Sequence, residues 1–404
     1  MAPLSGIRVL EVGRFASAPS CATVLADWGA DVVKLEPLTG DPARGPGSWD
    51  KAGRPNRPAN PRFDVHNRSR RSLALNLKAP PGQEVADRLL AETDVLVTNL
   101  RRSTLPALGL ESVEVRARHP HLIFAQVTGY GPGDDRHLRS YDHGAFWSYS
   151  GLASLFRNAQ GQPPQPAGGL GDRASGLALS GAVCAALLAR ERSGAGDHVE
   201  VSLLGTAFWL MASDVADALE RPDHERLISR EQAPIPTVNC FRCADGRWFW
   251  LQVMLAERDW PALVKALDAD WLNDVPRFEG GSSAGLRQAR AELVEALDEI
   301  FRRRPYAEWA RRLDDAGLTH APVHDLREAV HDPLAQASGS FREVAVGDDA
   351  RFHTVESPAF FASAGARTGT PAPAIGADTG QILCDLGYST SEIEALVADG
   401  VCAD

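Results

Sequence analysis

Up to about residue 130, short apolar runs alternate with helical patterns. The run IRVLEVG (7–13) precedes a helical pattern, APSCATVLADWGA (18–30), and a second apolar run, DVVKLEP (31–37), follows. Apolar runs rich in Val and Ile on both sides of a helical pattern are typical of a βαβ unit with parallel strands. Further strands are predicted at 71–77, 95–100 and 122–131. We therefore predict a doubly wound, Rossmann-like α/β domain over roughly the first 200 residues.

The pattern changes after residue 221. In NCFRCADGRWFWLQV (239–253), two β-rich arms flank an Ala-Asp-Gly turn, and amphipathic helical patterns follow. The last part of the chain is punctuated by Pro and Gly, so it must pack on something else to be stable. We expect the first part of a large α/β domain, a smaller α+β domain, and a C-terminal segment that returns to the large domain, at 1–221, 222–330 and 331–404.

Composition and charge narrow the classes of partner. The 404 residues are 44% hydrophobic and 24% charged, as in ordinary globular proteins, and the formal net charge is -11. Such a charge would repel nucleic acid and anionic membrane surfaces, so we expect neither as a partner. The apolar run 177–188 is interrupted by Gly and Ser and is shorter than a bilayer span, and the first residues lack a signal-peptide pattern. We expect a soluble, cytoplasmic protein.

The six cysteines are spread thinly, which does not favour a disulfide framework. Cys240 and Cys243 have CxxC spacing, but neither a second CxxC nor a His pair follows. A buried strand end explains these thiols as well as zinc does. We therefore expect no metal site.

The segment GGLGDRASG (168–176) places Asp172 after a glycine-rich turn, at the start of a helical pattern that runs to about Arg192. Aspartate is a common helix N-cap because its oxygen accepts a hydrogen bond from an amide of the first turn. Glycine on both sides would also leave room for a ligand at the carboxylate. The residues alone leave both interpretations of Asp172 open, a structural cap and a reachable functional group.

A second polar group lies upstream in HLRSYDHGAFWSYSG (137–151), where Arg139, Asp142 and His143 adjoin aromatic side chains. This stretch is either a polar loop that enters an apolar helix or a source of a second carboxylate near Asp172. A carboxylate there would shift the protonation and the nucleophilicity of the first.

Basic residues flank the predicted strands, either as solvated turns or as an edge that binds phosphate groups. They are Arg68, Arg70, Arg71, Lys78, Arg101 and Arg102. The segment EVGRFASAPS after the first strand lacks the GxGxxG pattern, so a dinucleotide is not favoured.

Nine motifs occur in the order of a known family: PLSGIRVLEVG, LADWGADVVKLEP, NRSRRSLALNLKAPPGQE, DVLVTNL, GYGPGDD, LGDRASGLALSGAVCAALLARERSGAGDHVEVSLL, CADGRWFWL, APVHDLREAVHDP and GADTGQILCDLGYSTSEIEAL. Together they resemble the class III CoA-transferases, or CaiB/BaiF family, which includes formyl-CoA:oxalate and carnitine CoA-transferases. The resemblance covers nearly the whole chain.

This resemblance implies that Asp172 is the catalytic carboxylate. It would attack the donor acyl-CoA to give a mixed anhydride and CoA thiolate, and the thiolate would return to form an aspartyl-CoA thioester. A free carboxylic acid would then attack that thioester. The CoA thioester is thus a substrate, and no permanently bound cofactor is expected.

The resemblance also assigns roles to further residues. Asp142 matches an acidic residue near the nucleophile, and Arg139 matches a basic CoA contact. The residues expected to bind CoA are Ala16, Ser17, Lys78, Asn99, Arg101 and Arg139. Ala16 and Ser17 replace a Gln-Ala pair that borders the active site of formyl-CoA transferase, which argues against oxalate or formate. A more apolar acyl pocket would suit the aromatic residues Phe146, Trp147, Trp209 and Trp248, although core packing explains them equally well.

The fold that the resemblance implies is a homodimer of two ring-shaped, interlocked subunits. Two other functions stay open. The α-methylacyl-CoA racemases share this fold and pair a His with the Asp as two bases, but His143 stands one place beyond the matching position. The third possibility is a silent subunit of a hetero-oligomeric transferase.

Overall fold

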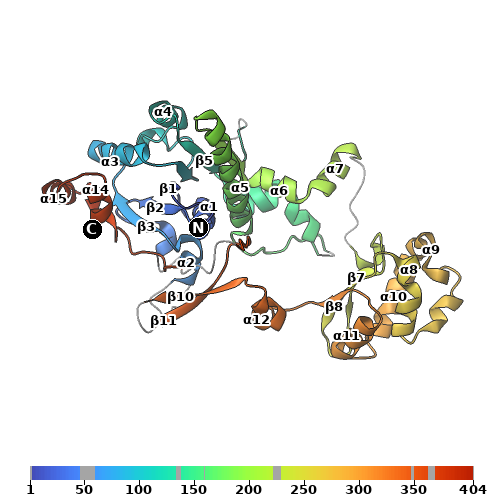
Figure 1. Cartoon of the computed structure of the whole chain (residues 1–404). Helices are drawn as coiled ribbons and strands as arrows, with labels where there is room; N and C mark the ends of the chain where they lie inside the picture. The colour runs from blue at the N-terminus through green and yellow to red at the C-terminus, as the bar shows by residue number, and fades with distance from the viewer. Residues whose placement is uncertain are drawn as a thin grey trace. The chain divides into compact units, whose positions relative to one another are not determined.

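The computed structural model describes residues 2–45, 60–132, 138–158, 160–221, 229–346, 350–362 and 369–403. The chain divides into two compact units, of which the first combines Met1–Ala216 with Ala337–Asp404 and the second is Asp217–Gln336. The blue N-terminal and red C-terminal segments therefore belong to the same unit (Figure 1). The domain boundaries expected at 221 and 330 stay a prediction.

The first unit is built on a seven-stranded sheet with the order β12-β3-β2-β1-β4-β5-β6. All neighbouring strands are parallel except β12, which is antiparallel to β3. This mixed α/β architecture with a mainly parallel sheet confirms the α/β part of the predicted fold class. The strands are β1 (Arg8–Val12), β2 (Asp31–Glu36), β3 (Arg71–Leu75), β4 (Val95–Thr98), β5 (Ile123–Thr128), β6 (His198–Ser202) and β12 (Cys402–Ala403).

Helices cover both faces of this sheet because its central strands are apolar on both sides (Figure 1). On one face, Val9 and Val97 pack with α1 (Ser17–Asp27) and α5 (Leu170–Ser193). On the other face, Leu10 and Leu96 pack with α3 (Pro80–Ala91), α4 (Ser112–Arg118) and α14 (Thr379–Asp385).

The C-terminal segment is fastened to β3. The carboxylate of Asp378 accepts a hydrogen bond from the Ser72 amide at 2.8 Å, and the Thr379 hydroxyl accepts one from the Ala74 amide at 3.2 Å. The unit also contains α2 (Pro61–Asn67), a π-helix at Asp142–Tyr149, α6 (Leu203–Leu210), the hairpin β10–β11 (Phe341–Val346, Ala350–Val355) and α15 (Thr390–Ala398). Helix α7 (Ala212–Glu220) begins in this unit and ends in the second.

The second unit has a three-stranded antiparallel sheet and a compact aromatic core. Phe301 packs against Phe241 and Phe249 with ring centroids 4.9 Å apart in both pairs. All six cysteines are free thiols, and the part of the chain that is described contains no cluster of metal-ligating side chains. The elements are β7 (Val238–Arg242), β8 (Trp248–Gln252), α8 (Ala256–Ala266), α9 (Ser283–Gln288), α10 (Arg290–Phe301), α11 (Tyr306–Asp315), β9 (His320–Pro322), α12 (Leu326–His331) and α13 (Pro333–Ala337).

Helix α5 is long and apolar enough to cross a membrane by length and composition alone. In the structure it packs on the sheet instead, with Leu179 and Val183 fully buried in the core. A small residue allows α1 and α5 to approach closely. A Cβ atom at Gly176 would lie 2.6 Å from the Ser17 carbonyl oxygen and 3.0 Å from the Cys21 amide nitrogen.

This contact predicts opposite effects for two glycines of the same helix. We expect Gly176→Ala to lower the free energy of unfolding by about 1–3 kcal/mol, because the new methyl group would push α1 away. A Cβ at Gly181 meets nothing within 4 Å, so Gly181→Ala should raise that free energy by up to about 1 kcal/mol. Chemical denaturation of both variants measures the difference, and equal effects would contradict this packing.

Candidate active site

A cavity of about 360 Å³ lies at the carboxyl ends of β1, β4 and β5. Strand order reverses between β1 and β4, the point at which doubly wound sheets bind their ligands. We call this hollow the site cavity. Its lining residues are Arg14, Phe15, Ala16, Ser17, Asn99, Leu100, Arg101, Arg102, Thr104, Val127, Thr128, Gly129, Tyr130, Gly131, Leu138, Ser140, Tyr141, Asp172 and Leu203.

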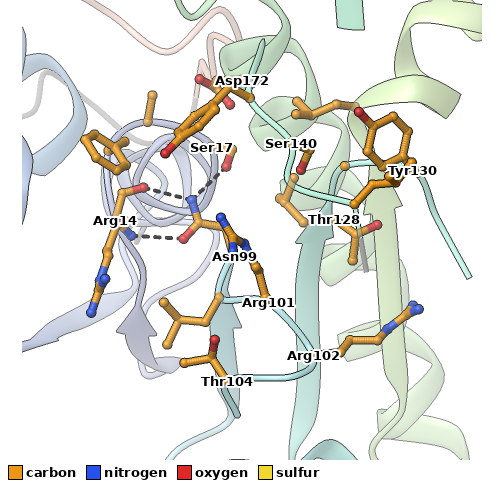
Figure 2. Close-up of a pocket in the computed structure, with 18 of the residues that line it drawn as sticks. Arg14, Ser17, Asn99, Arg101, Arg102, Thr104, Thr128, Tyr130, Ser140 and Asp172 are labelled. Carbon is orange, nitrogen blue, oxygen red and sulfur yellow. Dashed lines mark hydrogen bonds between the residues drawn. The ribbon is translucent and has the colours of Figure 1, made fainter. Parts of the chain in front are cut away.

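The cavity has a carboxylate at one end and cations at the other. Figure 2 shows Asp172 beside Ser17, with Arg101, Arg102 and Thr104 at the opposite end. Arg102 forms an ion pair with Glu200. No acidic side chain among the described residues pairs with Arg14 or Arg101. These two cations are therefore available to an anionic ligand.

Asn99 clamps the loop that follows β1. Its Oδ1 accepts a hydrogen bond from the Arg14 amide at 2.9 Å, and its Nδ2 donates to the Arg14 carbonyl at 2.8 Å and to the Ser17 hydroxyl at 2.9 Å (Figure 2). The side-chain amide of Asn99 is thus already engaged at both ends. Its role in this geometry is to fix the wall formed by Arg14–Ser17.

The structure corrects the interpretation of Asp172 as a helix cap. Helix α5 begins at Leu170, its N-cap is Gly169 with φ 76°, and Asp172 is the third residue of its first turn. Asp142 provides the capping oxygens instead. Its Oδ2 accepts a hydrogen bond from the Gly169 amide at 3.1 Å, and its Oδ1 accepts one from the Asp172 amide at 3.2 Å.

The glycine before Asp172 also has a packing role. A Cβ at Gly171 would lie 2.2 Å from the Phe146 ring and 2.5 Å from Oδ1 of Asp142. Glycine therefore lets the π-helix pack against the start of α5, rather than clearing space for a ligand. π-Helical turns are rare and are often found at functional sites.

The Asp172 carboxylate is available for chemistry. Within the described residues, no donor forms a hydrogen bond with its side chain. Burial raises its pKa to about 6, and the nearby charge of Asp142 adds to this rise, whereas Arg173 and His143 oppose it. A carboxylate with this pKa is mostly ionised at neutral pH and is a stronger base than an ordinary aspartate.

The structure brings most of the sequence-predicted site residues together. Those that line the site cavity are Ala16, Ser17, Asn99, Arg101 and Asp172, and Asp142 lies directly behind Asp172. Lys78 lines an adjoining groove of about 270 Å³, which shares Arg14 and Leu100 with the site cavity. We call it the Lys78 groove. Arg139 is exposed and lines neither hollow.

The aromatic residues proposed for an acyl pocket do not line the site cavity. Phe146 and Trp147 are buried in a core cluster, Trp209 is 79% exposed on α6, and Trp248 belongs to the second unit. The aromatic residues that do line the cavity are Phe15, Tyr130 and Tyr141. Sequence reasoning missed Arg14 and Phe15, although their place directly after the first predicted strand was a usable signal.

The charges around Asp172 predict opposite shifts of its pKa. Asp142→Asn removes a like charge and should lower the pKa of Asp172 by about one pH unit, whereas Arg173→Gln removes a cation and should raise it. The measurement is a ¹³C-carboxyl NMR titration, with Asp172→Asn used to assign the signal. A pKa that moves in neither variant would contradict the proposed electrostatics.

Known proteins resemble this chain over nearly its full length. The family model described as CoA-transferase family III matches residues 4–379. An (R)-2-hydroxy-4-methylpentanoate CoA-transferase of Clostridioides difficile is 30% identical over 395 residues, which covers 96% of this chain and 97% of that protein. A cinnamoyl-CoA:phenyllactate CoA-transferase of Clostridium sporogenes is 29% identical, with coverage of 98% and 96%.

Solved structures agree with these matches. The crystal structure of Rv3272 from Mycobacterium tuberculosis has a TM-score of 0.81 at 27% identity, and the alignment covers 95% of this chain and 99% of that one. A CaiB/BaiF family protein from Brucella suis has the same fold, with a TM-score of 0.82 at 24% identity and coverage of 95% and 99%. The chain is thus a transferase enzyme and belongs to CoA-transferase family III, the CaiB/BaiF family.

Proposed function

We propose that this enzyme moves CoA from a donor acyl-CoA to a free carboxylic acid, with Asp172 carrying the acyl and CoA groups in turn. The observation that supports this most directly is the Asp172 side chain itself. It is a half-buried carboxylate with its pKa raised to about 6, and no described residue donates a hydrogen bond to it. The cavity that it lines also contains Arg14 and Arg101, for which the described residues provide no acidic partner.

The two adjoining hollows suit the parts of a CoA thioester. The Lys78 groove is mostly apolar, with Leu35, Leu75 and Leu77 in its wall, and would take the adenosine, with Lys78 near a phosphate. Arg14, which lines both hollows, and Arg101 would bind the other phosphates. The pantetheine chain would then extend through the site cavity toward Asp172. The CoA contact expected for Arg139 has no support from this geometry.

In the first half of the reaction, the Asp172 carboxylate attacks the thioester carbonyl, the C–S bond breaks, and CoA leaves as a thiolate. The thiolate attacks the Asp172 carbonyl of the mixed anhydride and releases the donor acid. In the second half, the acceptor carboxylate attacks the carbonyl of the aspartyl thioester, the C–S bond breaks, and a new anhydride and CoA thiolate form. The thiolate then attacks the acceptor carbonyl of this anhydride and expels the Asp172 carboxylate. Asp172 is regenerated, and neither ATP nor a net proton is required.

The residues around Asp172 would support this sequence of steps. Helix α1 begins at Ser17 without a side-chain cap, so the amides of Ser17 and Ala18 can donate to the oxyanion that forms at the attacked carbonyl. Both carboxylate oxygens of Asp142 already accept hydrogen bonds from α5. Asp142 therefore acts as a positioning residue that holds the first turn of α5, rather than as a proton carrier.

The acceptor is proposed to be a hydrophobic or branched carboxylic acid. Phe15, Tyr141 and Leu203 line the cavity that reaches Asp172 and provide an apolar surface for the acyl group. The names of two similar proteins include 2-hydroxy-4-methylpentanoate and phenyllactate, which are acids of this apolar kind.

We also propose that the enzyme is a cytoplasmic homodimer of interlocked subunits, as the family resemblance implies. Exposed apolar side chains on two helices support an interface. Leu188 on α5 is 57% exposed, and Trp209 and Leu210 on α6 are 79% and 61% exposed. Such side chains commonly mark surfaces that a partner covers.

The direct test is Asp172→Ala, assayed for CoA exchange between a thioester and a free acid. We expect a loss of at least about 10³-fold, because Asp172 is the only carboxylate among the described residues that line the site cavity. Asp399→Asn, an exposed carboxylate on the C-terminal side of α15, is the control and should keep full activity.

Other results would identify the other functions. Loss of α-deuterium exchange in Asp172→Ala, without any CoA exchange in the wild type, would indicate a racemase. His143, its required second base, is not among the described residues that line the cavity. A wild-type protein that catalyses neither exchange would indicate a silent subunit.

A further inference from the structure

Four fully buried charges meet behind the loop that follows β1. Nζ of Lys34 lies 2.8 Å from Oε1 of Glu11 and 3.1 Å from Oδ2 of Asp41, and Arg70 forms an ion pair with the other oxygen of Glu11. Removing such charges from water is costly, so a buried ion cluster is weak support for stability. This cluster is better explained by what it holds in place.

The second oxygen of Asp41 holds the backbone of the cavity wall. Oδ1 accepts a hydrogen bond from the Phe15 amide at 3.2 Å and from the Ala43 amide at 2.9 Å. Phe15 has a φ of 60°, in the left-handed region that a bulky residue adopts only when its surroundings impose it. Lys34 fixes the carboxylate that imposes this conformation.

The left-handed backbone determines where the Phe15 ring lies. Phe15 is 44% exposed, and its ring meets that of Tyr141 edge to face, with the centroids 6.5 Å apart and the planes at 78°. Both rings line the site cavity together with Asp172. With a negative φ, the Cβ would leave the chain in another direction, and this aromatic pair would be lost.

We propose that Asp41, anchored by Lys34, is a positioning residue that holds Phe15 against Tyr141, and that Phe15 determines which acyl groups the cavity accepts. This inference deepens the proposed function, on which it rests for the identity of the ligand. Asp41 does not line the site cavity, so its effect on the acyl group must pass through Phe15.

The test compares the binding of 3-phenylpropionyl-CoA and acetyl-CoA to the full chain by calorimetry. We expect the wild type to prefer the phenylpropionyl thioester by about tenfold or more. Asp41→Asn and Phe15→Leu should each reduce that preference, measured as the ratio of the two Kd values, about fivefold or more. The double variant should lose no more of the preference than either single variant, because both substitutions remove the same contact of the Phe15 ring with the acyl group.

Several results would overturn the proposal. If Asp41 had a merely structural role, Asp41→Asn would weaken the binding of both thioesters equally. If Asp41 and Phe15 acted independently, the losses of preference caused by the two substitutions would multiply in the double variant. A wild type without the preference would also refute it. If Asp41→Asn does not fold, Phe15→Leu, which leaves the ion cluster intact, decides alone, and an unchanged preference then refutes the proposal.

The same measurement separates this inference from the proposed function, because binding requires no transfer. A protein that shows the expected changes in preference but transfers no CoA would refute the transfer mechanism and leave the role of Phe15 standing. Active transfer with an unchanged preference would refute only the role of Phe15.

Discussion

The site depends on one carboxylate that caps a helix of another segment. Asp142 accepts hydrogen bonds from the amides of Gly169 and Asp172 and so fixes the first turn of α5. Its charge acts together with burial to raise the pKa of Asp172 to about 6. The residue that positions Asp172 therefore also adds, through its charge, to the basicity that burial gives Asp172, while no described residue forms a hydrogen bond with the Asp172 side chain.

The sheet brings this carboxylate to the cations. Loops that follow neighbouring parallel strands meet at one edge, so Arg14 after β1 and Arg101 after β4 line the same cavity as Asp172. Asn99 and Asp41 then fix the loop after β1 from two sides. The ligand-facing side chains thus lie on short loops whose backbone is held by the buried Asp41 and the half-buried Asn99, which limits their freedom before a substrate binds.

The sequence predicted the parallel sheet because alternating apolar runs and helical patterns are local features, and the runs at 7–13 and 31–37 contain β1 and β2. Strand β12 is two residues long, and it pairs with β3, which is distant from it in sequence. No local pattern therefore indicates it. The interpretation of Asp172 as a cap was wrong for a similar reason, since the true cap comes from a distant segment. The left-handed backbone of Phe15 likewise depends on a hydrogen bond to Asp41, which is distant in sequence.

The most direct measurement of the central claim follows oxygen from the acceptor acid into the protein. When the thiolate attacks the acceptor carbonyl of the anhydride, one acceptor oxygen stays on Asp172. After a single turnover with an ¹⁸O-labelled acid, the tryptic peptide 158–173, in which Asp172 is the only acidic side chain, should therefore become heavier by one ¹⁸O substitution, and repeated turnover should replace the second oxygen as well. Transfer of CoA without label in this peptide would contradict the account.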